Sequence, residues 1–333
     1  MRELRLGVVG ANKQGREHLV AARGVRVVAA CDVSPDVRAA LRRDYPDLPC
    51  HDSLQEMCAT EGLDGLIVAV PHHVVPDLWP EILAAGLPVL KEKPLGRTLA
   101  EAHQLLGDAH RAGVPVVTAI QRRNHPSYVR LAELLAGQRV RALAATLHLG
   151  FDPTRASAGW RAERAKAGGG ALLDSGYHMV DLAQHLVGPL TFVHANLWCL
   201  DRPAGPDDME TDASLVARAG AAWVRIESRL GGRPDPERPG RYRKYERVDV
   251  ETDAHRYAAD RSGVWEDAVQ VYACPPDWRD GMALQLETFA ARIRDGRFDT
   301  ALVWDQVAAM RVISRAYAEL DRFGRLPSVW GTP

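Results

Sequence analysis

A histidine lies between two aspartates in the segment 174–181. On a helix, Asp174 and His178 are four residues apart and share a face, as do His178 and Asp181. An imidazole beside a carboxylate is a usable general acid or base, because the acid orients the ring and tunes its pKa toward neutrality. Gly176 costs such a helix about 1 kcal/mol, which the close approach of a flat ligand would explain. An ordinary polar pair at helical spacing explains the same pattern equally well.

The same segment offers ligands of the kind that bind metal ions. His178, Asp181 and His185 fall at helical spacings that could bring them together, and two histidines with a carboxylate can hold zinc. No H-E-x-x-H pattern or further ligand cluster accompanies them. We therefore expect no metal site and interpret His185 as a helix-surface or core histidine.

Three polar clusters each follow an apolar run, at 65–70, 87–90 and 114–120. The residues at these run ends are Val70, His72 and His73; Lys91, Glu92 and Lys93; and Gln121, Arg122, Arg123 and Asn124. Ligands of doubly wound sheets bind outside the carboxyl ends of the strands. One such cluster alone would be an ordinary solvated loop, whereas three in register on one edge indicate a ligand crevice.

The N-terminal residues predict the βαβ unit that binds a dinucleotide. An apolar run ends at Gly10, Gly15 opens an amphipathic stretch, and a second apolar run closes on Asp32. Such a turn presents backbone N–H groups and a helix N-terminus to a pyrophosphate, while the acid accepts hydrogen bonds from a ribose. Asn12 replaces the middle glycine of G-x-G-x-x-G. Asn tolerates positive φ, so we expect the turn to form with this side chain directed away from the phosphates.

The acid at the end of the second apolar run also bears on the choice of cofactor. A carboxylate at Asp32 favours a free ribose 2′-hydroxyl and would repel a 2′-phosphate. The next residues, Val33, Ser34 and Pro35, supply no arginine. We therefore expect NAD, although Lys13 in the turn could compensate and leaves NADP open.

The elements that position these residues alternate regularly up to about residue 123. Apolar runs and amphipathic stretches follow one another, and a capping box at 98–101 opens a helix that closes at Gly113. This alternation predicts an α/β fold whose N-terminal domain, residues 1–123, is a doubly wound parallel sheet of the Rossmann type.

The pattern changes in the remaining residues, 124–333. A helix follows Pro126, an amphipathic helix is expected at 172–186, and several strand-like segments lie between 190 and 272. Two helices, at 282–294 and 303–322, complete the chain. We predict a C-terminal α/β domain with an open mixed or antiparallel sheet.

Composition excludes several classes of function. The 333 residues suffice for two domains, and a net charge of −1 gives no electrostatic reason for a nucleic-acid or membrane partner. No apolar run is long enough to span a bilayer. Residues 1–4 lead directly into the first strand and leave no room for a signal peptide. The five cysteines are scattered and form no C-x-x-C pair, so we expect free thiols in a reducing cytoplasm.

Taken together, these motifs resemble the glucose–fructose oxidoreductase / inositol 2-dehydrogenase / MocA-like (Gfo/Idh/MocA) family over most of the chain. The matching pieces are the glycine turn, Glu92-Lys93-Pro94, Arg122-Arg123, Trp160-Arg161 before the glycine triplet 168–170, and D-x-G-x-H-x-x-D at 174–181. The combination of Glu-Lys-Pro with this last motif is specific for the family, whereas either motif alone would not be.

The resemblance implies a Rossmann domain, then an α/β domain whose open sheet often mediates oligomerisation, here into a homodimer or homotetramer. It implies a catalytic group of Lys93, Asp174 and His178. Cofactor contacts are expected from Gly10, Asn12, Lys13, Gln14, Gly15, Asp32, Val70, His72, His73, Glu92, Lys93, Gln121, Trp160 and Arg161. Substrate contacts are expected from Lys93, Arg122, Tyr177, Asp174 and His178, with individually weaker candidates in His148, Asp152, Arg155 and Arg229.

The implied reaction interconverts a secondary alcohol and a ketone on a cyclic polyol: a sugar, aminosugar, inositol or aminocyclitol. His178 would accept the hydroxyl proton, Asp174 would orient the ring or relay the proton, and the Lys93 ammonium would stabilise alkoxide charge. Two other functions stay open, a non-catalytic dinucleotide sensor and an NAD-dependent enzyme that cleaves glycosides. A sensor would have no need of the three catalytic residues.

Overall fold

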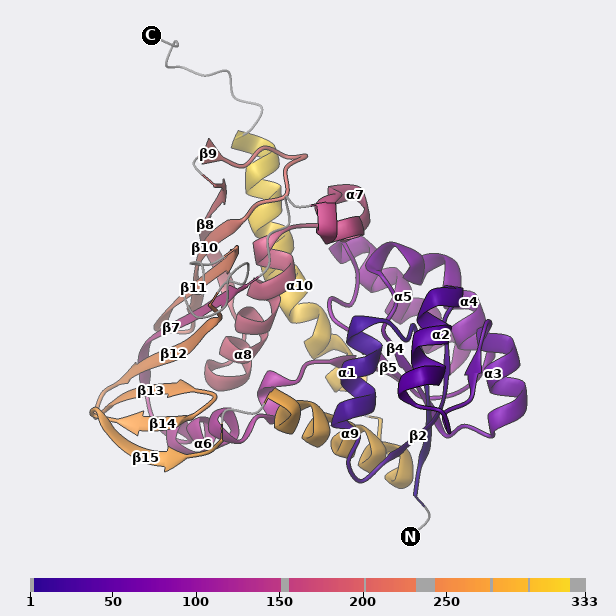
Figure 1. Cartoon of the computed structure of the whole chain (residues 1–333). Coiled ribbons are helices and arrows are strands. Elements are labelled where there is room, and N and C mark those ends of the chain that lie inside the picture. Colours follow the sequence, from indigo (N-terminus) through magenta and orange to yellow (C-terminus); the bar gives the residue numbers. More distant parts are fainter. Residues whose placement is uncertain are drawn as a thin grey trace. The chain divides into compact units, whose positions relative to one another are not determined.

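The computed structural model describes residues 3–150, 156–200, 202–231, 243–275, 278–298 and 300–323. The chain divides into two compact units (Figure 1). The first comprises Met1–Pro126 and Pro276–Val307, and the second comprises Ser127–Pro275 and Ala308–Pro333. Each unit is built around a sheet of its own.

The first unit contains a six-stranded parallel sheet. Its strands are β1 (Arg5–Val9), β2 (Arg26–Cys31), β3 (Cys50–His51), β4 (Gly65–Val68), β5 (Val89–Glu92) and β6 (Val116–Ala119). They are arranged in the order β3-β2-β1-β4-β5-β6 with every pair parallel. The predicted doubly wound sheet is confirmed. Its order reverses between β1 and β4, where sheets of this kind bind their ligands.

Helices flank this sheet. They are α1 (Lys13–Ala21), α2 (Pro35–Asp44), α3 (Leu54–Glu61), α4 (Val75–Ala84), α5 (Leu99–Ala112) and α9 (Trp278–Asp295), with short 3₁₀ turns η1 (His72–Val74) and η2 (Arg122–Asn124). Ser34, Ser53 and Thr98 cap α2, α3 and α5, each accepting a hydrogen bond from the N–H three residues on. The N-cap predicted at Thr98 is therefore confirmed, and the Glu101 carboxylate accepts a 3.2 Å hydrogen bond from the Arg97 N–H, one residue before the cap.

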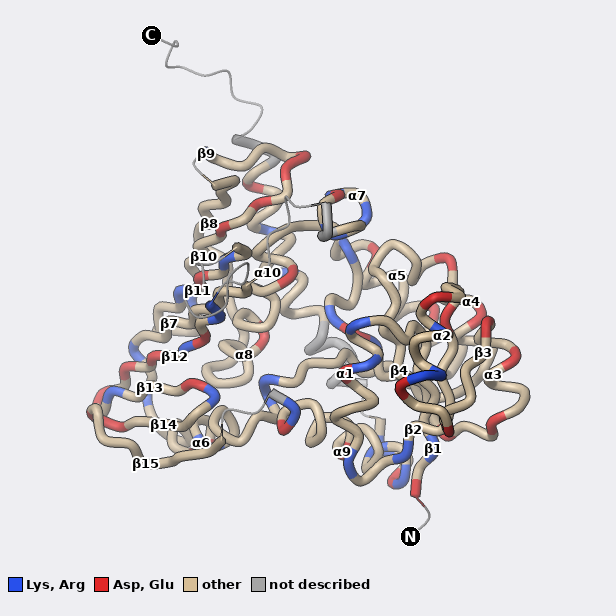
Figure 2. The backbone as a smooth tube through the Cα atoms, in the orientation of Figure 1, with Lys and Arg blue, Asp and Glu red and all other residues tan. Residues whose placement is uncertain are grey.

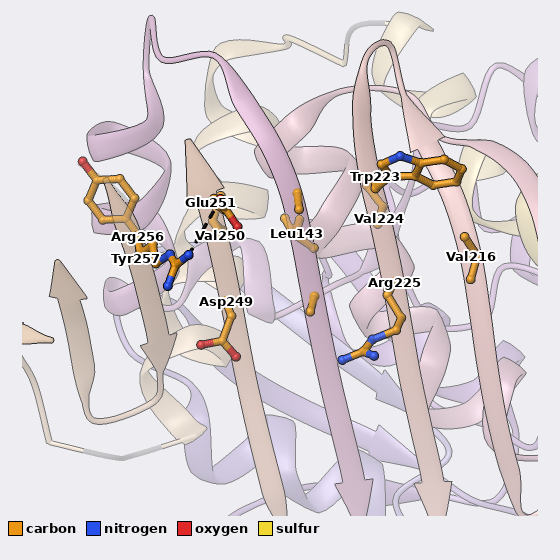
Figure 3. A pocket seen from close by; sticks show the side chains of 12 residues that line it. Leu143, Val216, Trp223, Val224, Arg225, Asp249, Val250, Glu251, Arg256 and Tyr257 are labelled. Atoms are coloured by element: carbon orange, nitrogen blue, oxygen red, sulfur yellow. Dashed lines mark ion pairs between the residues drawn. The ribbon is translucent and has the colours of Figure 1, made fainter. Parts of the chain in front are cut away.

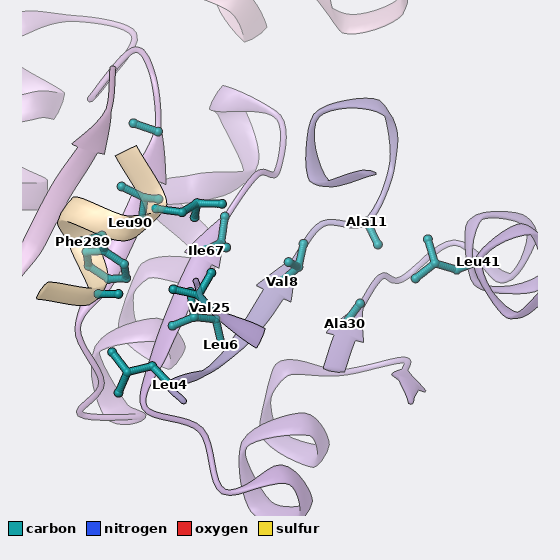
Figure 4. Packing of buried hydrophobic residues seen from close by; sticks show 13 residues of the cluster. Leu4, Leu6, Val8, Ala11, Val25, Ala30, Leu41, Ile67, Leu90 and Phe289 are labelled. Atoms are coloured by element: carbon teal, nitrogen blue, oxygen red, sulfur yellow. The ribbon is translucent and has the colours of Figure 1, made fainter. Parts of the chain in front are cut away.

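The core of the first unit includes a helix from the far end of the chain. Leu286 and Phe289 of α9 pack with strand residues such as Leu6 and Leu90 in one buried cluster (Figure 4). This differs from the predicted division at residue 123, which placed every later helix in the second domain. An amphipathic pattern shows that a helix must bury one face but does not identify the sheet that buries it.

The second unit contains a nine-stranded mixed sheet. Its strands are β7 (Val140–Leu149), β8 (Thr191–Cys199), β9 (Arg202–Pro203), β10 (Asp212–Ala219), β11 (Ala222–Leu230), β12 (Tyr245–Thr252), β13 (Arg256–Asp260), β14 (Gly263–Glu266) and β15 (Val269–Ala273). The order is β15-β14-β13-β12-β7-β11-β10-β8-β9. The β7–β11 pair is parallel and the other pairs are antiparallel, as expected of a mixed sheet.

Helical segments accompany this sheet. They are α6 (Pro126–Leu135), η3 (Ala156–Ala162), α7 (Arg164–Ala167), η4 (Leu172–Gly176), α8 (Tyr177–Val187) and α10 (Thr300–Phe323), whose residues from 308 on belong to the second unit. Along β10 and β11 buried and more exposed residues alternate. The sheet packs on η4 and α8, and residues of both charge signs are interspersed along its strands (Figure 2).

The helix predicted at 172–186 is not a continuous α-helix. Its first turn, η4, is a π-helix, and α-helical geometry begins only at Tyr177. Two local features favour the wider turn. Gly176 is a weak helix former, and the Ser175 hydroxyl donates a 2.9 Å hydrogen bond to the Ala171 carbonyl, a bond that commonly bends helices. π turns of this kind occur frequently at functional sites.

Two expectations from composition can be compared with the structure. All five cysteines are free thiols, as their scattered positions predict. Within the ranges that the structure describes, no helix combines the length and apolar character needed to cross a membrane.

Candidate active site

The turn after β1 depends on two glycines. Gly10 has φ of +84°, and a Cβ there would lie 2.8 Å from the Cγ1 atom of Val70. A Cβ on Gly15 would lie 2.1 Å from the Gly10 carbonyl oxygen. Any side chain at either position would separate β1, α1 and the residues after β4. The structure thus brings the two glycines of the predicted dinucleotide turn next to Val70, another expected cofactor contact.

Asn12 is the N-cap of α1. It has φ of −78° and ψ of −157°, and its Oδ1 accepts a 2.8 Å hydrogen bond from the Lys13 N–H. The expectation that this position uses the positive-φ tolerance of Asn is wrong, because the left-handed conformation falls on Gly10 instead. The side chain is engaged at the helix terminus, the end that attracts anions.

Asp32 lies at the end of β2 and braces the same turn. Its Oδ2 accepts from the Ala11 N–H and its Oδ1 from the Ser34 N–H, both at 2.9 Å. Each carboxylate oxygen has a second lone pair, so ribose hydroxyls can still bind. Arg38, which sequence reasoning missed, donates to the carbonyl oxygens of Asp32 and Val33 at 2.8 and 3.0 Å. Arg38 lies in the first turn of α2 and is therefore close to the end of β2. Its position six residues after Asp32, at the start of a predicted helix, was a signal that could have identified it.

The loop that carries Lys93 is held by a buried lysine. Lys91 is 2% exposed, and its Nζ donates to the carbonyl oxygens of Glu92 and Pro94 at 2.9 and 2.7 Å. Burial lowers the pKa of Lys91 to about 8. The Lys91 ammonium therefore stabilises the loop and does not line the ligand crevice in which the sequence analysis placed it. Its bonds fix the carbonyls on either side of Lys93, whose peptide bond to Pro94 is cis.

The carboxylate of Glu92 has a partner that the sequence analysis did not single out. His18 of α1 is fully buried, and its Nε2 lies 2.7 Å from Glu92 Oε1. Gln14, one turn earlier, donates to the same oxygen at 3.4 Å. The dinucleotide turn and the Glu-Lys-Pro loop are thus joined by side chains. The sequence did contain a signal for this contact, since His18 lies on the buried face of the helix that follows the glycine turn.

The other predicted clusters of the first unit follow neighbouring strands. His72 and His73 form η1 after β4, and both are partly exposed. Gln121 precedes η2 after β6, and Arg122 is buried. Because β4, β5 and β6 are adjacent and parallel, their carboxyl ends share one edge, as predicted. Gly281 of α9 packs there, where a Cβ would lie 2.8 Å from the Gln121 carbonyl oxygen.

The second unit carries the aspartate and histidine predicted to act as acid and base. Asp174 is half-buried in the π turn η4, and His178 is 6% exposed on α8. The pair therefore spans the junction between the π turn and α8, whereas His178 and Asp181 both lie in α8 and keep α-helical spacing. Tyr177 and Asp181 are fully buried. The predicted catalytic group is divided between the units, with Lys93 in the first.

The remaining predicted contacts are also in the second unit. In η3 the Arg161 guanidinium lies 4.3 Å from the centre of the Trp160 ring, a cation–π contact. Arg229 pairs with His148 across β11 and β7. Its neighbour Ser228 faces η4, so strand alternation puts Arg229 and His148 on the opposite sheet face from that helix. The expectation that these two join Tyr177 at one site is wrong. Asp152 and Arg155 lie outside the described residues.

One group of possible metal ligands occurs among the residues that the structure describes. His255, Glu266 and Asp267 bring ligand atoms within 4.8 Å of one another on a partly exposed hairpin. His255 Nδ1 lies 2.9 Å from Asp267, and this hydrogen bond raises the pKa of the imidazole. An ion pair between His255 and Asp267 at the surface therefore explains why these side chains lie together.

Two family models match the chain. Residues 4–120 match the model described as an oxidoreductase family with an NAD-binding Rossmann fold, and residues 129–229 match the GFO/IDH/MocA C-terminal domain. The chain belongs to the Gfo/Idh/MocA oxidoreductase family. The predicted family is thus confirmed, and the first unit is its NAD-binding Rossmann domain.

Relatives of this Gfo/Idh/MocA protein include enzymes with named substrates. The rhizopine catabolism protein MocA of Rhizobium meliloti is 29% identical over 189 residues, 56% of this chain and 58% of that protein. The chain spans little more than half the length of this relative and of two other curated relatives that it matches. Levoglucosan dehydrogenase, solved with NADH and levoglucosan, is similar with a TM-score of 0.80 and 19% identity over 97% of this chain and 98% of that one. GenD2 of gentamicin A biosynthesis, solved with NAD, has a TM-score of 0.78 and 24% identity over 98% and 96%.

The residues of this Gfo/Idh/MocA domain fit a dinucleotide. The glycine-only spacing at Gly10 and Gly15 keeps side chains out of the turn, and α1 begins directly after it. The N-terminus of such a helix favours a pyrophosphate, and the carboxylate of Asp32 suits ribose hydroxyls. The matching family model describes this domain as the NAD-binding Rossmann fold of an oxidoreductase family.

Proposed function

We propose that this chain is an NAD-dependent dehydrogenase that interconverts a secondary alcohol and a ketone on a cyclic polyol: a sugar, aminosugar, inositol or aminocyclitol. The observation that supports this most directly is the presence, in one unit, of the glycine-only dinucleotide turn and the braced loop of Lys93. The names of the relatives support the substrate class, since levoglucosan is a cyclic sugar derivative.

Each proposed residue has one chemical task. Gly10, Gly15 and the start of α1 would hold the pyrophosphate, and Asp32 the ribose. NAD, when bound, takes up the hydride that leaves the alcohol carbon. His178 accepts the hydroxyl proton on a ring nitrogen, and Asp174 orients this ring or receives the proton. The Lys93 ammonium hydrogen-bonds the same hydroxyl oxygen and stabilises the negative charge that develops there.

The test is an absorbance assay for reduced nicotinamide with inositols, sugars and aminocyclitols, each with NAD or NADP. We expect turnover with one substrate class and a loss of at least about 100-fold in kcat for Lys93→Ala, as for other general acid and base groups. Lys166→Ala is the control, because Lys166 is a partly exposed lysine paired with Glu163. Near-normal turnover of Lys93→Ala would contradict the assignment. Tight NADH binding without turnover on any substrate would favour the sensor.

We also propose that the outer face of the nine-stranded sheet binds a second copy of the chain, forming a homodimer or homotetramer. This face has a pocket whose lining includes the small residues Ala142 and Ala144 together with Trp223, Arg225 and Asp249, the last three labelled in Figure 3. Trp223 is 51% exposed, and a large apolar ring beside a hollow over alanines suits a self-complementary interface.

A further inference from the structure

A single buried carboxylate lies at the start of the segment that carries Asp174 and His178. Glu210 is 0% exposed, and both of its oxygens accept hydrogen bonds. Oε2 accepts from the Gly170 N–H at 2.9 Å, and Oε1 accepts from the Leu172 N–H at 3.0 Å. The two oxygens thus bind the amides on either side of residue 171, immediately before the π turn.

The backbone of Glu210 holds the same segment. Its carbonyl oxygen accepts from the Ala171 N–H at 2.8 Å, so three consecutive amides are bonded to one residue. A Cβ on Gly170 would lie 2.0 Å from that carbonyl oxygen, so only glycine fits at this position. Further along the segment, the Asp174 N–H donates to the Gly170 carbonyl at 2.9 Å. The anchoring therefore continues directly into Asp174.

Two side chains make this buried charge tolerable. Arg164 Nη1 lies 3.3 Å from Oε2, and the guanidinium stacks 4.3 Å from the ring centre of Tyr317. The Tyr317 hydroxyl donates to Oε1 at 2.6 Å. Burial nevertheless raises the pKa of Glu210 above its ordinary value. A buried charge with this many partners is costly to disturb, because losing one partner leaves the others uncompensated.

We infer that Glu210 is a positioning residue that fixes the register and direction of the helix bearing Asp174 and His178. The expected effect of Glu210 on catalysis rests on the proposed function. The anchoring of the helix by Glu210 does not depend on it. Neither the sequence motifs nor the family resemblance assigned a role to Glu210. Its carboxylate is needed because two backbone N–H donors and two side-chain donors converge on it, and all four need acceptors.

The experiment compares Glu210→Gln with Tyr317→Phe. Glutamine has the same shape, but its amide nitrogen cannot accept a hydrogen bond, so either Gly170 or Leu172 loses its acceptor. Phenylalanine removes one donor and leaves both carboxylate oxygens on the amides. Three quantities are measured for each variant: amide hydrogen exchange over residues 170–178 without substrate, the Kd for NADH, and kcat and KM with the substrate found in the absorbance assay.

For Glu210→Gln we expect exchange over 170–178 to become at least tenfold faster and kcat to fall at least tenfold. The Kd for NADH should change less than twofold, because the dinucleotide turn lies in the other unit. Tyr317→Phe should change kcat less than threefold. Unchanged exchange in Glu210→Gln, or faster exchange with kcat within twofold of wild type, overturns the inference. If the wild type shows no turnover, the proposed function fails instead, and the exchange rates alone decide whether Glu210 anchors the helix.

Discussion

Charged side chains at buried or half-buried positions determine much of the local geometry. Lys91 and Glu210 bind backbone groups beside the residues proposed to react, and Asp32 braces the glycine turn through the Ala11 amide. Arg38 introduces a competing effect at the last of these sites, because its positive charge lies at the strand end where Asp32 would exclude a 2′-phosphate. The preference between NAD and NADP is therefore a balance between these two side chains.

This balance predicts the behaviour of Asp32→Ser. Removing the carboxylate abolishes its repulsion of a 2′-phosphate and leaves Arg38 available to pair with it. We expect the KM for NADP to fall at least tenfold, which corresponds to about 1.4 kcal/mol of binding free energy. Steady-state kinetics with both cofactors measure the change. The double variant Asp32→Ser/Arg38→Ala should lose the gain, and an unchanged NADP preference in the single variant would rule out a role for Arg38.

At the scale of elements, close packing of backbones positions the candidate site. Helix α1 can start against β1 only because Gly15 lacks a side chain. Helix α8 begins with a π turn in which Gly176 lies close to Ser228, where a Cβ would be 3.0 Å from the serine hydroxyl. In both cases a glycine sets the distance between a helix and a sheet and hence the direction of the helix.

Replacing Gly15 by alanine tests this packing. A Cβ 2.1 Å from the Gly10 carbonyl oxygen must push α1 away, and overpacking of this kind costs about 1–3 kcal/mol. We expect the free energy of unfolding to fall by that amount and the Kd for NADH to rise at least tenfold. Gly107→Ala in α5 is the matched control, since its Cβ would approach only the flexible Arg111 side chain at 3.4 Å. It should gain about 0.5–1 kcal/mol in urea unfolding. Equal effects in the two variants would contradict the packing argument.

At the scale of the whole molecule, the two units divide the proposed chemistry between them. The first holds the dinucleotide turn and Lys93, and the second holds Asp174 and His178 on one face of its sheet. The other face of that sheet presents Trp223 among paired charges such as Arg225 and Glu227. The proposed docking of a second copy on this face would leave the helix that carries Asp174 and His178 on the other face uncovered.

Trp223→Glu tests the proposed interface. A carboxylate in place of the ring would be buried unpaired against the second copy, and we expect the assembly to dissociate, with at least a tenfold rise in its Kd. Light scattering across a dilution series measures the mass. Val20→Glu is the control, because Val20 is 50% exposed on α1 of the first unit. Dissociation by both variants would show that the effect is not specific to this face of the sheet. Dissociation by neither would exclude this face as the interface.

Patterns that depend on neighbouring residues were predictable from the sequence alone. Strands, caps, the glycine turn and the family motifs are local, since apolar periodicity and turn chemistry act over a few residues. They predicted the doubly wound sheet and the shared edge of the polar clusters after β4, β5 and β6. Parallel strands place their carboxyl ends together whatever the rest of the chain does.

Tertiary structure alone decided which distant groups meet. The pairing of His18 with Glu92, the convergence of Arg164 and Tyr317 on Glu210, and the packing of α9 in the first unit join segments far apart in the sequence. Burial decided the role of Lys91, whose charge alone suggested a crevice. The π turn at Asp174 packs against β11, a contact that no spacing rule contains. These features depend on which surfaces are buried together, because desolvation makes a polar group bond to whichever partner the fold brings to it.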